Sequence, residues 1–392
     1  MKVHLQARFL NSIEQISKAQ WQHLNTSRCP FLRYEFFKAL EDSESACAES
    51  GWQPHHLTLT NDDSESGGEA NVEGNIHAIL PMYLKSHSWG EYVFDWGWAD
   101  AFKQHDVEYY PKLVATLPFT PVTSDKLLSK TIEQQKLFHL LTDYCQQHGI
   151  NSWHLLYCPE IPVDQFKAHF SDDVYQRNTV QFHWFNRDYK SFDDYLTTFT
   201  ARKRKNTRKE RLSIEQQCIS VRRILGHNVT AAELDFFYLT YQLTYLKRNH
   251  QPHLSFAFFQ QIFNSMADNL LLVVASHQEQ DVACALFFFD DVNLYGRYWG
   301  SSQFFNNLHF ELCYYQGIEF CLEKNLQCFN PGTQGEHKIQ RGFEPVLTHS
   351  YHWIKHAAFK PAVQNFCLQE QQQMKIYQQQ CLQALPFKNV EE

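Results

Sequence analysis

The segment Gly335-Glu336-His337-Lys338 places a carboxylate, an imidazole and an amine side by side after a glycine. Transfer of an acyl group to an amine requires a base that deprotonates the amine and a group that stabilises the oxyanion. Glu336 or His337 can act as the base, while Lys338, with Arg341 close behind, can stabilise the oxyanion. The alternative is a tight loop whose charges pair with one another. We take Glu336, His337 and Lys338 as candidate catalytic residues.

A fourth candidate is Glu311, which lies in the first turn of a helix predicted from about Leu308 to Leu326, at the edge of its apolar stripe. A carboxylate there is costly unless it is paired or lies in a cleft, where its pKa rises. We predict that Glu311 binds substrate or takes part in catalysis. The alternative is that it complements the helix dipole or pairs with Arg297. Arg297 and its neighbour Tyr298 belong to a predicted strand that we expect to line the same cleft as Glu336, His337 and Lys338. The alternative is that this aromatic strand is simply part of the core.

A basic run, residues 202–211, reads RKRKNTRKER and holds seven cations and one anion. Like charges at helical spacing destabilise a helix unless an anion compensates them, and arginine side chains suit phosphate oxygens. We therefore predict a site for a tRNA backbone, a phosphorylated precursor or the phosphates of coenzyme A. An acidic partner or a plain solvated helix are the alternatives. The residues assigned to substrate or phosphate binding are Arg202, Arg204, Lys205, Arg208, Arg211, Arg297, Tyr298 and Arg341.

The second half of the chain contains the elements that must position these residues. Strands are predicted at Val180–Phe185, Ile219–Leu225, Leu270–Ala275, Val282–Phe289, Leu294–Gly300, Gln327–Phe329 and Val346–Ile354, and helices from Phe192, Ala231, Phe256 and Leu308. This order of strand, helices, meander, helix and strand predicts an α/β protein with a mixed sheet and helices on both faces, as in GNAT-type acyltransferases.

The first half looks like a degenerate version of the same order, although no residue-level repeat proves a duplication. Its aromatic segment Glu91–Phe102 begins as a predicted strand, and a short helix is predicted over Glu108–Ala115. We predict two tandem GNAT-like domains, residues 1–178 and residues 179–392. The second would carry a basic helix, 192–217, and a Gln-rich C-terminal tail.

Composition excludes several classes of protein. Hydrophobic residues make up 43% of the 392 and charged residues 20%, so the chain can bury two cores and is not disordered. The longest apolar run, Val282–Phe289, is far shorter than the roughly 20 residues of a membrane helix, and no signal peptide is visible. Eleven scattered cysteines without a Cys-x-x-Cys pair favour free thiols in the cytoplasm.

Motifs of other enzyme classes are missing from the sequence. A Walker loop, a Gly-x-Ser-x-Gly elbow and a Gly-x-Gly-x-x-Gly loop are all absent, which argues against an NTPase, a hydrolase or a dinucleotide enzyme. His349, His352 and His356 have ligand-like spacing, but they point to different faces of a predicted strand. No metal site is therefore expected.

Six segments carry a family resemblance: Glu91–Phe102, Tyr109–Leu128, Phe192–Arg211, Leu294–Ser302, Leu308–Glu319 and Gly332–Ile354. In them the chain resembles the FemAB-like family of predicted N-acyltransferases, and more widely the double-GNAT aminoacyltransferases that build peptidoglycan cross-bridges. The resemblance implies an N-acyltransferase that moves an acyl or aminoacyl group from acyl-CoA or aminoacyl-tRNA to a small-molecule or peptide amine, such as a cell-wall precursor. No activated nucleophile stands out, so we expect direct attack by the amine, without a metal or redox cofactor.

One feature of standard acetyltransferases has no convincing counterpart. The Arg/Gln-x-x-Gly-x-Gly/Ala loop that binds the pyrophosphate of acyl-CoA is not found, and Arg223–Asn228 is the nearest approach. This departure puts coenzyme A in doubt as the donor. The rival interpretation is a non-catalytic module that binds a phosphate-bearing or nucleic-acid partner through its basic helix, with a steep salt dependence. Membrane insertion is expected in neither case.

Overall fold

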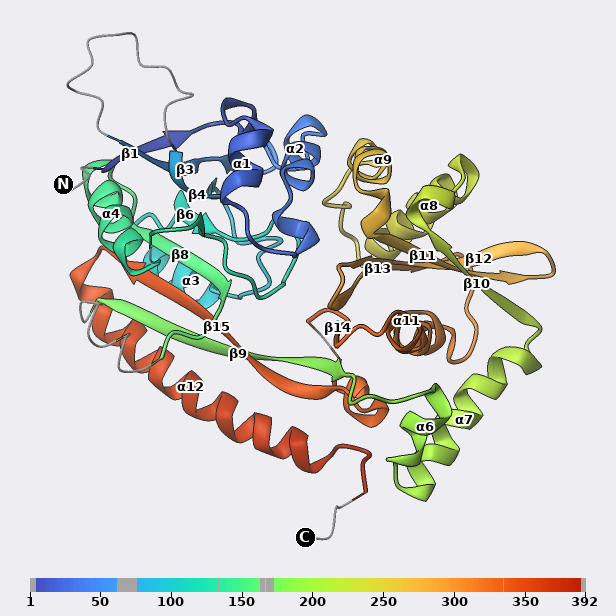
Figure 1. Cartoon of the computed structure of the whole chain (residues 1–392). Helices are drawn as coiled ribbons and strands as arrows, with labels where there is room; N and C mark the ends of the chain where they lie inside the picture. The colour runs from blue at the N-terminus through green and yellow to red at the C-terminus, as the bar shows by residue number, and fades with distance from the viewer. Residues whose placement is uncertain are drawn as a thin grey trace. The chain divides into compact units, whose positions relative to one another are not determined.

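The computed structural model describes residues 5–61, 76–132, 134–162, 166, 173–333 and 335–388. The chain forms two compact units (Figure 1). Unit 1 comprises residues 1–179 and 347–375, and unit 2 comprises residues 180–346 and 376–392. Within the described ranges, no helix is long and apolar enough to cross a membrane.

Unit 1 contains a small antiparallel sheet in the order β1 (Leu5–Leu10), β3 (His56–Asn61), β4 (Ile76–Leu80) and β7 (Leu128–Ser129). Its other strands follow the order β9 (Val174–Phe185), β15 (Glu344–Ile354), β8 (Ser152–Cys158), β6 (Lys112–Ala115), β5 (Tyr83–Lys85) and β2 (Trp52–Pro54). The helices are α1 (Lys18–Leu24), α2 (Tyr34–Asp42), α3 (Trp96–Gln104), α4 (Gln134–Gln147) and the first part of α12 (Lys360–Gln383). Strand β8 is buried along its whole length, and Phe138 of α4 packs on its Trp153 with ring centroids 5.0 Å apart.

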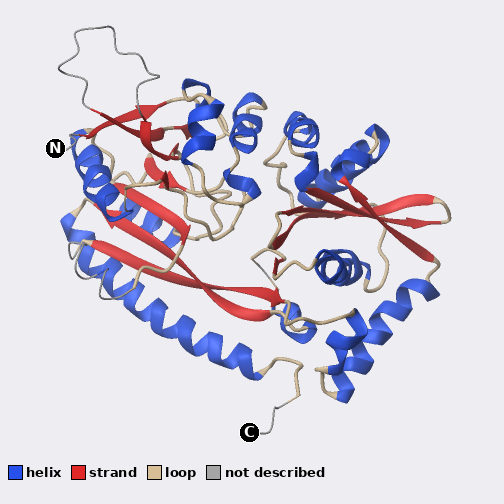
Figure 2. Ribbon diagram, in the orientation of Figure 1, coloured by secondary structure: helices blue, strands red, loops and turns tan. Residues whose placement is uncertain are grey.

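Unit 2 is built on an antiparallel meander of β10 (Ile219–Leu225), β11 (Leu270–His277), β12 (Gln280–Phe289) and β13 (Asn293–Ser301). Strand β14 (Cys328–Asn330) then pairs with β13 in parallel, after a helical crossover of α10 (Leu308–Phe310), the π-helical turn η5 (Glu311–Tyr315) and α11 (Gln316–Lys324). Helices α8 (Ala231–Leu246) and α9 (Phe256–Ser265) cover one face of the meander, and α11 lies on the other (Figure 2). The basic run lies in α7 (Ala201–Gln216), preceded by the short α6 (Phe192–Thr197).

The predicted class, a mixed α/β fold with helices on both faces, is confirmed. The element order of unit 2 is the one that the sequence predicted for a GNAT-like domain. Two helices differ in detail from the prediction. The helix predicted over 192–217 is interrupted at Thr198–Thr200, where the N–H of Thr200 donates to the carbonyl of Pro386. The helix predicted from Leu308 contains the π-helical turn η5.

The division into domains also differs from the prediction. The sequence predicted a single boundary, with all of residues 179–392 in the second domain. The units divide at Thr179, but residues 347–375 return to unit 1. The reason is the pairing of β15 with β8, in which Tyr351 lies opposite Leu155 and Trp353 opposite Trp153. These aromatic side chains complete the core of unit 1.

Candidate functional site

Lys338 is a buried cation on the short helix η6 (Glu336–Arg341) of unit 2. Its side chain is almost fully enclosed, and its Nζ donates to the carbonyl oxygen of Gly332 over 2.6 Å. In the part of the chain that the structure describes, no carboxylate forms an ion pair with it. Burial, together with the charge of Arg297, lowers the pKa of Lys338 to about 7. Lys338 is therefore poised between an ammonium ion and a neutral amine near neutral pH.

Arg297 lies beside this amine. Its Nη1 donates to the carbonyl of Gly296 over 2.7 Å, and a side chain at Gly332 would begin 3.9 Å from the same Nη1. His183 on β9 shares the neighbourhood, since burial and the charges of Arg297 and Lys338 lower its pKa to about 3. Arg297 and the Lys338 amine, which is a cation below a pH of about 7, thus lie next to a neutral imidazole, an arrangement that favours an anionic group.

His337 and Arg341 flank Lys338 on η6. His337 Nε2 lies 2.7 Å from the hydroxyl of Tyr314, and burial with the nearby cations lowers its pKa. The Arg341 guanidinium donates to both oxygens of Glu210 on α7, over 2.8 and 2.9 Å, and stacks on the ring of Phe310. The carboxylate of Glu210 fixes Arg341, so His337 is the better placed of the two to exchange a proton.

Glu311 has a different environment from the one expected for a catalytic carboxylate. Its two oxygens accept from Arg211 of α7 over 2.9 and 3.2 Å, and one also accepts from Gln316 over 2.8 Å. Arg211 donates in addition to Glu319 over 2.6 Å. The structure thus shows the pairing alternative, with Arg211 and not Arg297 as the partner, and this contact favours a structural role for Glu311.

The remaining cations of α7 differ in what they contact. Arg208 pairs with the exposed Asp193 over 2.8 Å, and Arg204 donates to the carbonyl of Phe199 over 3.4 Å. Arg202 and Lys205 are exposed. The helix therefore directs Arg211 inward and leaves Arg202 and Lys205 facing solvent.

Two predicted residues lie away from Lys338. Tyr298 packs edge-on against Tyr241 of α8 and Phe259 of α9, each with ring centroids 5.4 Å apart. These contacts place Tyr298 on the face of β13 that α8 and α9 cover. Glu336 is exposed and accepts from the hydroxyl of Tyr377 over 2.7 Å.

The sequence reasoning missed two residues near Lys338. His309 is close enough to His337, Lys338 and Arg341 that burial and these groups lower its pKa to about 4. Tyr314 contacts His337 from the π-helical turn. Tyr314 is three residues from Glu311 and would share its face in a regular helix, but the sequence reasoning did not single it out.

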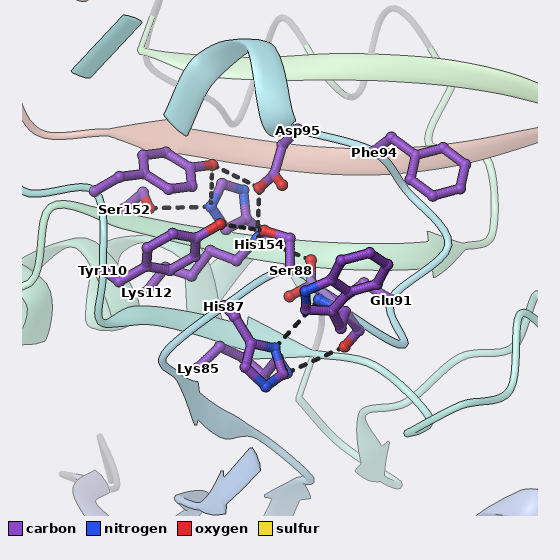
Figure 3. A network of polar contacts seen from close by, with 12 residues as sticks. Lys85, His87, Ser88, Glu91, Phe94, Asp95, Tyr110, Lys112, Ser152 and His154 are labelled. Carbon is purple, nitrogen blue, oxygen red and sulfur yellow. Dashed lines mark hydrogen bonds and ion pairs between the residues drawn. The ribbon is translucent and has the colours of Figure 1, made fainter. Parts of the chain in front are cut away.

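A second polar cluster, in unit 1, was also missed (Figure 3). Lys112 of β6 is fully buried and pairs with Glu91, over 2.8 Å, and with Asp95. It also donates to Ser88 over 2.8 Å. From the sequence, Lys112 was predicted to lie in a short helix. The structure instead places it, fully buried, as the first residue of strand β6.

The hydrogen-bond network extends from Asp95 through the neutral side chains of Tyr109, His154 and His352. Tyr109 donates to Asp95 over 2.6 Å, and its hydroxyl lies 3.4 Å from His154 Nε2. The Nδ1 atoms of His154 and His352 lie 2.7 Å apart, and burial holds the pKa of both imidazoles well below the usual range. The described residues contain no cluster of three or more His, Cys, Asp or Glu side chains suited to a metal ion.

The segment Arg223–Asn228 does not form an open anion site at the start of α8. Arg223 pairs with Glu323 over 2.5 Å, and the first N–H groups of α8 are capped by Thr230 and Glu233. A pocket of about 590 Å³ lies beside this segment, lined in part by Gly226, His227 and Gln260. Because Glu233 already occupies the helix terminus, this segment gives no support to a pyrophosphate loop.

Comparison with known proteins finds one matching sequence family and several solved structures with a similar chain course. The sequence matches the FemAB-like family, described as a family of peptidoglycan biosynthesis and recognition, over residues 12–389. No curated protein matches the sequence significantly. Solved structures with a similar chain course include L-PGS from Bacillus licheniformis, at 9% identity over 86% of this chain and 96% of that one, with a TM-score of 0.48. FemX is another, at 11% identity over 83% of this chain and 93% of that one, with a TM-score of 0.45. A tandem GNAT protein from the clavulanic acid biosynthesis pathway has 9% identity over 90% of this chain and 99% of that one, with a TM-score of 0.42. Similarities of this size describe the chain course and nothing of the activity.

Proposed function

The chain belongs to the FemAB-like family, and from this premise we propose that it transfers an acyl or aminoacyl group from an activated donor to an amine. The donor would be an acyl-CoA or an aminoacyl-tRNA, and the acceptor an amine of a cell-wall precursor. The amine nitrogen attacks the carbonyl carbon, the carbonyl oxygen takes the negative charge, and the bond to the donor's sulfur or ribose oxygen then breaks.

The observation that carries this proposal is the enclosed Lys338, whose hydrogen bond goes to a backbone carbonyl and not to a carboxylate. Negative charge on the carbonyl oxygen develops only during attack, and a buried cation without its own anion stabilises that charge strongly. Arg297 beside Lys338 would add to the effect. His337, neutral and bonded to Tyr314, would accept the proton that the attacking nitrogen loses.

The donor's phosphates would lie against the exposed cations of α7. Arg202 and Lys205 face solvent there, and Lys209 is also exposed. Both donors carry phosphate groups, so this surface suits either. A non-catalytic module would use the same surface and would bind the polyanion without transferring anything.

The test is to incubate the full chain with an acyl-CoA or an aminoacyl-tRNA and a lysine-containing peptide, and to follow the peptide by mass spectrometry. We expect a mass increase with one donor class, and a rate about 10²–10³ lower in Lys338→Met, as for loss of an oxyanion stabiliser. Lys324→Met, an exposed lysine of α11, is the matched control. Binding of a donor without any transfer would instead establish the module.

A further inference from the structure

Helix α8 of unit 2 is apolar on two of its sides. Its inner side covers the meander (Figure 2), and Phe237, Thr240 and Tyr241 are buried there. A second series of apolar residues follows the same helix at spacings of four and three residues: Ala232, Phe236, Leu239, Leu243 and Leu246. A helix at the surface of a protein usually carries polar residues on its outer side. The packing of α8 on the meander therefore does not explain the second series.

The second series, which we call the outer stripe, is accessible to solvent. Leu239 is 49% and Leu246 50% exposed, and the other three residues are exposed or half-buried. Helix α9 packs on a different side of α8, where the ring centroids of Tyr238 and Phe256 lie 5.1 Å apart. An exposed apolar series of this kind marks a contact surface and not a part of the core.

The spacing of the outer stripe is that of a coiled-coil seam. Alternating steps of four and three residues give a period of seven, at which apolar side chains pack between those of a second helix. The stripe can meet a copy of itself in antiparallel orientation, with Leu239 of one copy beside Leu243 of the other. Phe236 then lies beside Leu246 of the other copy, so each large side chain of the stripe gains an apolar neighbour.

Charged residues beside the stripe agree with this orientation. Glu233 and Lys247 flank the stripe on the same side, because they are fourteen residues, or two periods, apart. The antiparallel register brings Glu233 beside Lys247 of the other copy, and two-fold symmetry forms this contact twice. A parallel pair would instead place Lys247 beside the uncharged Gln242.

Both charged groups are able to form this contact. Lys247 is exposed and donates to the carbonyl of Ser301 over 3.1 Å, and none of the described carboxylates pairs with it. Glu233 accepts from Arg222 over 3.2 Å, and a carboxylate with about four acceptor positions can accept from a second cation. Exposed ion pairs add little affinity, so the apolar stripe would supply most of the binding and the charges would set the orientation.

We propose that the outer stripe of α8 is the contact surface for a second copy of this chain, which pairs with it as an antiparallel, two-fold symmetric dimer. Each copy contributes one helix, so the interface is small and the dissociation constant should lie in the micromolar range. This inference does not depend on the proposed transfer reaction.

Sedimentation equilibrium of the full chain across micromolar concentrations tests the inference, and we expect a reversible equilibrium of monomer and dimer. Leu239→Glu places a charge in the centre of the seam and should raise the dissociation constant at least about a hundredfold. Leu239 lies outside the core of unit 2, so the variant should fold, which circular dichroism checks. Leu212→Glu is the matched control, because Leu212 of α7 is also 49% exposed, and it should leave the constant unchanged.

The orientation of the two helices has its own test. Lys247→Glu places two carboxylates side by side and should raise the dissociation constant about threefold to tenfold, less at high salt. Lys324→Glu makes the same change at an exposed lysine of α11 and should have no effect. A chain that stays monomeric at all these concentrations, or a folded Leu239→Glu variant that dimerises as tightly as the original chain, would overturn the inference. An unchanged constant in Lys247→Glu would overturn the antiparallel register.

Discussion

At the scale of single residues, Lys338 differs from Arg211 and Arg341 because no carboxylate of the described residues pairs with it. Arg211 and Arg341 both donate to glutamates, and the two glutamates bound to Arg211 outweigh burial and raise its pKa. Lys338 donates to a carbonyl, and burial lowers its pKa. A buried ammonium without a carboxylate partner forms a strong ionic interaction only when negative charge develops on a bound group. This is the behaviour expected of a residue that stabilises a transition state.

The pKa of Lys338 predicts how the transfer rate depends on pH. With a pKa of about 7, the amine is a cation below that pH and neutral above it. Stabilisation of the oxyanion needs the cation, so kcat/KM should fall as pH rises through about 7. Lys338→Arg keeps its charge at all these pH values and should remove this fall. Steady-state rates between pH 5.5 and 9 test the assignment, and a fall that persists in Lys338→Arg would assign it to another group.

Glu311 gives the opposite prediction, because its charge is already used by Arg211. Glu311→Gln should lower the free energy of unfolding by about 1–3 kcal/mol, since it leaves a half-buried arginine with a weaker partner. The transfer rate of the folded variant should change little. Glu323→Gln, which weakens a more exposed pair with Arg223, is the control and should cost less than about 1 kcal/mol. Lost activity at unchanged stability in Glu311→Gln would restore the catalytic role that the sequence suggested.

At the scale of elements, helix α7 has two kinds of charged residue: two that pair inside unit 2 and three that face solvent. Glu210 and Arg211 point inward and hold η6 and the π-helical turn, whereas Arg202, Lys205 and Lys209 remain exposed. The helix has little apolar surface of its own, with Thr207 and Ile214 as its buried residues. Its ion pairs therefore fix its position, and its outer cations are left for a partner.

Neutralising the outer cations tests that division of roles. Arg202→Gln, Lys205→Gln and Lys209→Gln together should weaken donor binding without loss of stability, because none of these side chains packs in the core. If the donor is a tRNA, the slope of log K against log salt concentration should become shallower by about 0.7–0.9 per lost phosphate contact. Arg248→Gln, an exposed arginine elsewhere in unit 2, should change neither quantity. Unchanged donor affinity and slope in the triple variant would exclude α7 as the phosphate site.

The elements also show where sequence reasoning succeeds and where it stops. Apolar runs such as Val282–Phe289 identify the meander strands, because strands of this kind are buried on both faces. The π-helical turn at Glu311–Tyr315 has no periodic signal, so the contact of Tyr314 with His337 could not be foreseen. Lys112 was misjudged for a related reason: a charged residue lowers the strand signal, and its partners Glu91 and Asp95 lie far from it in sequence.

At the scale of the whole molecule, neither unit is a continuous piece of chain. Residues 347–375 leave unit 2 and add the second part of β15 and the first part of α12 to unit 1. In unit 1, β15 lies between β9 and β8, with the hydroxyls of Thr348 and Thr179 2.6 Å apart and His352 next to His154. The predicted boundary at residues 178/179 does not include this return of residues 347–375 to unit 1. The local sequence of a strand near the C-terminus does not indicate which of two hydrophobic cores it joins.

The return of β15 predicts that residues 1–179 cannot fold alone. Without residues 347–375, strands β8 and β9 lose the partner between them, and the core loses Tyr351 and Trp353. Exposed edges and a depleted core should leave this fragment without a cooperative thermal transition. A fusion of 1–179 to 347–375 through a flexible Gly/Ser linker restores these contacts and should unfold cooperatively, as followed by circular dichroism. A fusion carrying residues 347–375 in scrambled order controls for added length, and cooperative unfolding of 1–179 by itself would contradict the assignment of β15 to unit 1.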